Sequence, residues 1–246
     1  MDRLIYTAMT GATASANRQA VLANNLANAS TNGFRSELAT YRAVPLRGDG
    51  ATTRVFALEA TSGYLDTPGS VQRTGRNMDV MAVKNAWFAV QGLDGTESYT
   101  RNGSFETMPD GTLVTGNGLT VLSDGGGPIT IPANAEVSIG GDGSIGAKVR
   151  GQPSSIVGRL KMVTPTADDP LKRGDDGLFR SASGDPLPED TTAKLQSGVL
   201  EGSNVNPIET MVGMIQTARQ FEVQMRLLQT AESNDRSAGQ LLGLQG

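Results

Sequence analysis

The two ends of the chain carry helical patterns, whereas the long segment between them does not. Residues 2–28 form a stripe of mostly small side chains, and residues 207 to about 232 form a longer apolar stripe. The segment between them is rich in glycine and in short β-branched runs. This pattern predicts an α+β fold in which a Gly-rich antiparallel β domain is flanked by two helices that pair as a coiled-coil-like assembly domain. It favours a subunit of a larger assembly.

The N-terminal stripe repeats at intervals of three and four residues. Its members are Leu4, Ala8, Gly11, Ser15, Gln19, Leu22 and Leu26. Each leucine could contribute about 1.5–3 kcal/mol by burial, whereas ordering the backbone costs about 1–2 kcal/mol for every residue. The helix therefore needs a partner, and its small side chains would let another helix approach closely.

Several asparagines lie inside the same helical pattern, namely Asn17, Asn24, Asn25 and Asn28. In a helix interior Asn costs up to about 0.7 kcal/mol relative to Ala. One explanation is a solvated polar face on a helix that ends at Asn32-Gly33. We favour another, in which Asn25 and Asn28 bond to backbone or Asn groups of neighbouring subunits and fix their register.

The C-terminal helix has clear start signals. Asn206 can cap it, Pro207 suits its first position, and Glu209 stands where a capping-box carboxylate would. The apolar seam that follows consists of Ile208, Met211, Met214, Ala218, Phe221, Met225 and Leu228. This spacing predicts a coiled-coil seam with adaptable methionine packing, although an ordinary globular core helix would show the same stripe.

Between about residues 73 and 184, short β-branched runs alternate with turn dipeptides. Asn102-Gly103, Asp110-Gly111 and Asp142-Gly143 predict hairpin turns, and the runs 129–131, 136–139 and 156–163 predict further strands. We therefore expect four parts. These are an N-terminal assembly helix at 1–35, a partly extended connector at 36–72 with a possible strand at 53–58, a β-rich central domain at 73–198, and a C-terminal assembly helix at 199–246 that packs with 1–35.

Composition argues against most enzymatic chemistry and against nucleic-acid binding. The chain has no His and no Cys, which removes most imidazole, thiol and zinc chemistry. Its 21 Lys and Arg residues are scattered, so no nucleic-acid or anionic-membrane patch is expected. No run suggests a membrane span or a cleavable signal peptide. We expect no catalytic residue, no cofactor, no metal site and no membrane insertion.

Other motifs that resemble enzymatic sites have structural explanations. Residues 141–146 satisfy G-x-G-x-x-G, but a strand pattern follows where a nucleotide site needs a helix. The acidic pairs at 168–169 and 175–176 adjoin Pro170 or Gly177 and therefore predict turns instead of an acid/base couple or a calcium loop. Trp87-Phe88 lies in an apolar run and predicts core packing instead of a sugar-stacking platform.

Residues 23–35, Ala-Asn-Asn-Leu-Ala-Asn-Ala-Ser-Thr-Asn-Gly-Phe-Arg, resemble the N-terminal signature of the bacterial flagellar basal-body rod and hook family. Residues 1–9, 99–105 and 197–206 extend the resemblance over nearly the whole chain, and the first and last of these are most similar to the proximal-rod members. One departure is at 79–88, where relatives often have a glycine-containing turn before the aromatic pair.

This resemblance implies a structural subunit of the flagellar proximal rod, the periplasmic drive shaft that transmits torque for motility. It implies other rod proteins and further copies of the chain as partners, joined through the terminal helices. It also implies export by the flagellar type III apparatus without a cleaved signal peptide. The alternatives are a distal-rod or hook paralogue, a secreted surface-binding β protein and, behind these, a carbohydrate-active enzyme.

Overall fold

The computed structural model describes residues 2–45 and 55–243, which form two compact units. Unit 1 contains the N-terminal segment up to Ala29, the segment Ser36–Leu65 and the chain from Val205 onward. Unit 2 contains Ser30–Arg35 and Asp66–Asn204. A helix at each end and antiparallel strands between them confirm the α+β class. Residues 46–54 of the expected connector lie outside the described residues.

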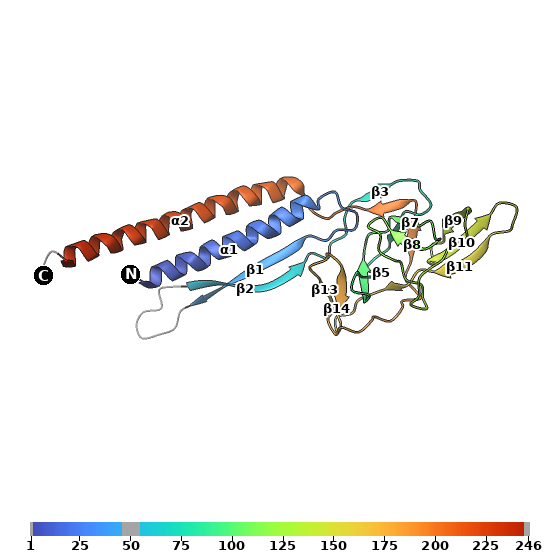
Figure 1. Cartoon of the computed structure of the whole chain (residues 1–246), viewed down its shortest axis with the longest axis horizontal. Coiled ribbons are helices and arrows are strands. Elements are labelled where there is room, and N and C mark those ends of the chain that lie inside the picture. Colours follow the sequence, from blue (N-terminus) through green and yellow to red (C-terminus); the bar gives the residue numbers. More distant parts are fainter. Residues whose placement is uncertain (1, 46–54, 244–246) are drawn as a thin grey trace. The chain divides into compact units, whose positions relative to one another are not determined.

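Unit 1 consists of two helices and a β-hairpin. Helix α1 (Asp2–Ala27) and helix α2 (Pro207–Gly243) run antiparallel and side by side, and the hairpin lies along α1 (Figure 1). Asn206 caps α2 as expected, because its Oδ1 accepts hydrogen bonds from the backbone N of Ile208 at 3.1 Å and of Glu209 at 3.3 Å. This satisfies two of the amides that a helix N-terminus leaves without partners.

Residues 36–65 have more regular structure than a connector requires. Strands β1 (Glu37–Pro45) and β2 (Val55–Tyr64) pair antiparallel, in a register that starts at Glu37 opposite Tyr64 and shifts once between Thr40 and Tyr41. The described part of the expected strand at 53–58, residues 55–58, lies within the longer strand β2. Burial alternates along most of β1, as expected for a ribbon with one covered face.

Unit 2 is built from short antiparallel strands. Its largest sheet has the order β12-β5-β6-β14-β13, a second has the order β11-β10-β9, and three further pairs are β15–β4, β16–β3 and β7–β8. The strands are β3 (Val71–Arg73), β4 (Val80–Ala82), β5 (Trp87–Gln91), β6 (Glu97–Thr100), β7 (Phe105–Thr107), β8 (Leu113–Thr115), β9 (Ala135–Ile139), β10 (Ser144–Val149), β11 (Ser155–Arg159), β12 (Met162–Val163), β13 (Leu171–Arg173), β14 (Phe179–Ser181), β15 (Leu195–Ser197) and β16 (Val199–Glu201).

The Asp-Gly dipeptides form hairpin turns, as predicted. At Asp110 and Asp142 the carboxylate accepts a hydrogen bond from the backbone N two residues later, at 2.9 and 3.1 Å. The glycines that follow have φ values of 89° and 86°, which L-residues with a side chain rarely adopt. Strand β10 follows the second turn, so the G-x-G-x-x-G segment lacks the helix that nucleotide binding requires.

Asn102-Gly103 does not form the predicted hairpin. Strands β6 and β7 on either side of it join different partners, β5 and β14 for the first and β8 for the second. A Cβ at Gly103 would collide with the carbonyl of Val80, whose backbone N donates to Gly103 O at 2.9 Å. Close backbone approach, not a tight turn, accounts for glycine at this position. Of the other predicted strands, 129–131 is reduced to an isolated bridge and 156–163 divides into β11 and β12.

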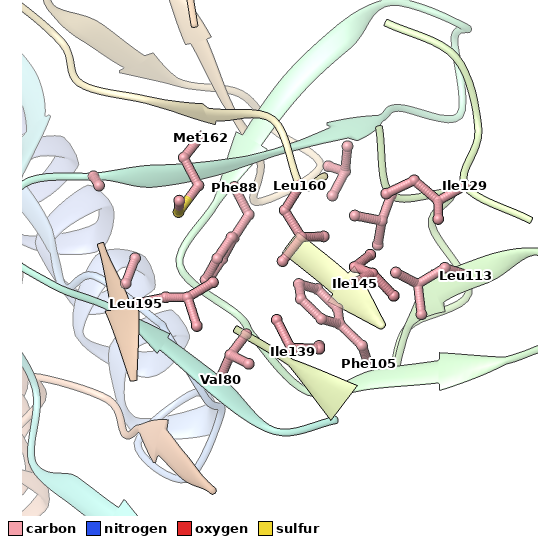
Figure 2. Packing of buried hydrophobic residues seen from close by; sticks show 14 of the residues in the cluster. Val80, Phe88, Phe105, Leu113, Ile129, Ile139, Ile145, Leu160, Met162 and Leu195 are labelled. Carbon is pink, nitrogen blue, oxygen red and sulfur yellow. The ribbon is translucent and has the colours of Figure 1, made fainter. Parts of the chain in front are cut away.

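The core of unit 2 is a single apolar cluster (Figure 2). Phe88 and Phe105 meet edge to face with their ring centroids 5.4 Å apart, and Ile145, Leu160 and Leu113 close around them. Trp87 points to the other side of β5 and packs on Phe179 at 4.6 Å between centroids. Both aromatic residues of the pair are fully buried, which confirms core packing.

Unit 2 is expected to lose stability in acid. The pKa values of Asp94, Asp142 and Asp190 are lowered, chiefly by hydrogen bonds from the hydroxyls of Thr96, Ser144 and Thr192. A lowered carboxyl pKa stabilises the fold above its unfolded value of 3.8, and this contribution is lost as the pH falls through the folded value. Urea midpoints should therefore hold down to about pH 4 and decline as the pH falls below the unfolded value of 3.8.

Asp142→Asn is the matched control for this pH dependence, because it keeps an acceptor for the turn but does not titrate. The decline should be shallower in this variant than in the parent chain. A midpoint that stays constant through the acid range would contradict the role of the turn carboxylates.

Candidate assembly surfaces

The predicted stripe of small residues lies on the covered face of α1. Ala8 and Ser15 are buried, and Gly11, Gln19, Leu22 and Leu26 are half-buried. Gly11 lies beneath the Gln224 side chain, and Gly213 leaves room for Leu22, whose Cδ1 would stand 3.4 Å from a Cβ at that glycine. Leu4 lies in α1, but its side chain is outside the described residues. Small residues therefore bring α1 and α2 close together.

The face of α2 against α1 only partly coincides with the predicted seam. Met214 and Leu228 are half-buried, whereas Ala218 is exposed and Ile208, Met211, Phe221 and Met225 are 75, 50, 38 and 39% exposed. The buried and half-buried positions of α2 lie on one face, and besides Gly213 they recur at intervals of three, four and seven residues, namely Thr210, Met214, Thr217, Gln224, Leu228 and Ala231. The predicted seam therefore shares Met214 and Leu228 with this face, its other members are exposed in the subunit, and their part in assembly stays a prediction.

Back-bonded threonines explain this difference. The hydroxyls of Thr210 and Thr217 donate to the carbonyls of Asn206 and Gly213, both at 2.8 Å, and both residues are buried. Their polar groups are thus satisfied within α2, and their methyl groups are left for packing. Ser15 does the same on α1, with a 2.9 Å bond to Gly11 O. A search for apolar residues overlooks such positions.

The opposite side of α2 carries several large apolar side chains that are about half or more exposed. We call it the outer face of α2, and its members are Ile208, Met211, Val212, Ile215, Val223 and Leu227. Ile208 is 75% and Ile215 is 55% exposed. Tyr6 and Met9 are exposed in the same way on α1. So many large apolar side chains on adjacent helix turns are typical of a surface that another protein covers.

Asn25 has hydrogen-bond partners within the chain, whereas the expected bond to a neighbouring subunit stays a prediction. Its Nδ2 donates to Glu37 O at 3.0 Å, and its Oδ1 accepts from Glu37 N at 2.8 Å, so the buried amide pairs the end of α1 with the start of β1. Asn28 also bonds locally, from Nδ2 to Asn24 O at 2.9 Å. These bonds satisfy the backbone where α1 ends.

The last residues of the 23–35 signature lie in unit 2 and are buried there. Phe34 lies under the Arg173 guanidinium, 4.7 Å from its ring centroid, and Arg35 is only 3% exposed. Gly33 has a φ of 70°, and a Cβ there would collide with the backbone of Arg101 and Asn102. The Asn-Gly-Phe-Arg part of the signature is therefore packed within its own chain.

Arg101 organises the turn that lacks the expected glycine. Its guanidinium donates to the carbonyls of Ala82 at 3.1 Å, Lys84 at 3.0 Å and also Ala86, and lies 5.8 Å from the centroid of Trp87. Burial lowers the pKa of the Arg101 guanidinium, and the negative charge of its partner Glu201 acts in the opposite direction. In this turn Lys84 has a φ of 58°, a left-handed conformation that glycine adopts more easily.

Lys84→Gly is expected to stabilise unit 2 by about 0.5–1 kcal/mol, because it relieves the left-handed strain at the cost of some unfolded-state entropy. The Lys84 side chain is exposed, so little packing is lost. Urea unfolding followed by the fluorescence of Trp87, the only tryptophan, measures the change. Lys84→Ala keeps the strain and should show no such gain; equal stabilisation by both variants would contradict the explanation.

Metal-ligand clusters and membrane-spanning helices are absent from the part of the chain that the structure describes. No group of three or more acidic side chains there could hold a metal ion, and no helix there is long and apolar enough to cross a membrane. Of the acidic pairs, Asp169 accepts bonds from Ser183 and Asp176 pairs with Arg180 at 2.7 Å, as turn residues do. Their positions give no acid/base couple.

Paired terminal helices with an uncovered apolar face are typical of a subunit that polymerises. Three family models match the chain: flagella basal body rod protein over residues 5–35, the flagellar hook protein FlgE/F/G D1 domain over 84–147, and the C-terminal model of flagellar basal body rod FlgEFG proteins over 196–241.

Relatives match over almost the full length. The chain is 45% identical over 253 residues to the flagellar basal-body rod protein FlgF of Escherichia coli (strain K12), covering 99% of this chain and 100% of that protein. FlgF of Salmonella typhimurium is 44% identical with the same coverage, and FlgG of Bacillus subtilis (strain 168) is 31% identical over 94% of this chain and 96% of its own. The chain belongs to the flagellar basal-body rod protein family, which is structural and not enzymatic.

Proposed function

We propose that this chain is a structural subunit of the proximal part of the flagellar basal-body rod, and that it polymerises through α1 and α2. The observation that carries the assembly mode is the outer face of α2, where Ile208 and Ile215 remain exposed after α1 and α2 have packed. Burying one such side chain contributes about 1.5–3 kcal/mol, and a rod repeats each contact along its length. The proximal position is supported by the 45 and 44% identity to FlgF of Escherichia coli and Salmonella typhimurium, against 31% to FlgG of Bacillus subtilis.

The contacts between subunits are heterologous in this proposal. The outer face of α2 and the exposed Tyr6 and Met9 of α1 are different surfaces, so one subunit would present one surface to a neighbour that presents another. Such contacts build open helical assemblies instead of closed rings. Leu22, Leu26, Met214 and Leu228 would stabilise the helix pair within each subunit, and Ile208 and Met211 would contact neighbours, which are other rod proteins or further copies of this chain.

The rod would act as a shaft. Many small apolar contacts spread along the helices would resist twisting together and pass torque from the motor toward the hook across the periplasm. Export through the flagellar type III apparatus without cleavage completes the proposal, and it is supported by the family membership. In the unassembled subunit, the exposed apolar helix faces would need to be kept apart from other copies.

Mass spectrometry of purified basal bodies tests this function. Peptides of the chain, including its intact N-terminus, should copurify with the rod and disappear when the gene is deleted, with loss of motility. Basal bodies that assemble and rotate normally without the chain would contradict the proposal. A distal-rod or hook position would instead appear as retention of the chain only in structures that extend beyond the proximal rod.

A further inference from the structure

The three segments through which the chain enters and leaves unit 2 meet at one place. Gly33 N donates to Glu201 O at 2.7 Å, Gly202 N donates to Ser70 O at 2.7 Å, and Asn204 N donates to Phe34 O at 3.3 Å. The Asn204 side chain also donates to Thr67 O at 2.9 Å. We call the segments 30–35, 66–70 and 201–204 together the clamp. Segment 201–204 is hydrogen-bonded to both of the others, and Arg35 and Asp66 form an ion pair between the first two at 3.6 Å.

The carboxylate of Glu201 lies at the centre of the clamp and is 1% exposed. Its Oε1 accepts from Gly69 N at 3.0 Å and forms an ion pair with Arg35 Nη1 at 2.7 Å. Its Oε2 accepts from Arg101 Nε at 2.8 Å. One side chain therefore contacts both of the other clamp segments and the Arg101 that fixes the turn before Trp87.

Charge makes these contacts interdependent. Arg35 and Arg101 are both 3% exposed, both lie within 6 Å of the Trp87 ring centroid, and share a single buried carboxylate. A second carboxylate, that of Asp66, has its Oδ1 3.6 Å from Arg35 Nε and is 42% exposed. If one segment moved away, a buried charge would lose its partner, which costs far more than an ordinary hydrogen bond. The clamp should therefore open as a whole or not at all.

We propose that Glu201 is a positioning residue for assembly. By holding the clamp closed, it fixes the points of unit 2 at which the chain continues into α1, into the β1–β2 hairpin and into α2. The part of this inference that concerns assembly rests on the proposed function; the part that concerns the clamp does not. The signature residues Gly33 and Arg35 then contribute to assembly indirectly, because they bind Glu201 instead of a neighbouring subunit.

Hydrogen exchange of the full chain tests the clamp. Glu201→Gln keeps the shape but removes the charge, and it should speed amide exchange in 33–35, 66–70 and 201–204 together, by roughly tenfold or more for a lost charge-assisted bond. Protection of β9 and β10 should remain. Glu106→Gln is the control, since Glu106 is 59% exposed and its change should alter none of these segments. Faster exchange in only one segment would overturn the coupling.

Incorporation into basal bodies separates positioning from simple stabilisation. The double variant Arg35→Gln with Glu201→Gln removes one of the two buried positive charges, so unit 2 should be more stable than in Glu201→Gln alone. The clamp stays open in both variants, and both should enter basal bodies at roughly a tenth of the parent level, as expected for the loss of one such bond. Restored incorporation in the double variant, or normal incorporation of Glu201→Gln, would overturn the proposal.

Two further outcomes are also decisive. If Glu201→Gln unfolds unit 2, which a red shift of Trp87 fluorescence would show, hydrogen exchange and incorporation into basal bodies are measured on the double variant alone. If the parent chain itself is missing from basal bodies, the proposed function fails, while the exchange pattern still confirms or overturns the clamp.

Discussion

A chain with Ile215→Asp is expected to fold like the parent and to be absent from the rod. Ile215 is 55% exposed on the outer face of α2, so the aspartate remains in water in the free subunit. In an assembled rod the same carboxylate would be buried against a neighbour without a partner, at a cost of about 3 kcal/mol or more for each contact. Incorporation, measured by quantitative mass spectrometry of basal bodies, and swimming should both be lost.

The matched control is Ile215→Val, which keeps the face apolar and should incorporate and swim like the parent. Circular dichroism and the urea midpoint should be unchanged in both variants. An aspartate variant that enters the rod and supports swimming would show that the outer face of α2 is not an assembly surface.

Trp87→Ala is expected to destabilise unit 2 by about 3–5 kcal/mol, a large part of the stability of a domain of ordinary size. Trp87 is fully buried, packs on Phe179, and lies beneath the guanidinium groups of Arg35 and Arg101. Its removal would leave a cavity beside two buried charges. Urea unfolding followed by circular dichroism measures the loss, because no other tryptophan is present.

Leu93→Ala is the comparison for this prediction. Leu93 is 91% exposed at the turn between β5 and β6, so its truncation should change the free energy of unfolding by less than about 0.5 kcal/mol. Equal effects of the two substitutions would contradict the description of the Trp87 environment.

Local pattern was sufficient to predict α1 and the Asp-Gly turns of unit 2. The inner stripe of α1 is recognisable because Ala8, Gly11 and Ser15 are small and spaced at one helix face. The Asp-Gly turns are recognisable because the carboxylate, the left-handed glycine and the next amide lie within three residues. Both signals depend only on neighbours along the chain.

Long-range contacts explain what the sequence did not predict. The register of α2 depends on Thr210 and Thr217, whose buried methyl groups have no apolar signal. Glu201 and Arg101 are 100 residues apart, and nothing near either residue indicates the other. The bonds between Asn25 and the backbone of Glu37 were not predicted, because a backbone group 12 residues away carries no side-chain signal.

A reconstruction of the assembled rod by electron cryo-microscopy, at a resolution that shows side chains, tests the assembly claim most directly. We predict that Ile208, Val212 and Ile215 of each copy of this chain lie buried against helices of neighbouring subunits. A rod in which that face of α2 contacts only solvent, or in which the chain is absent, would contradict the account.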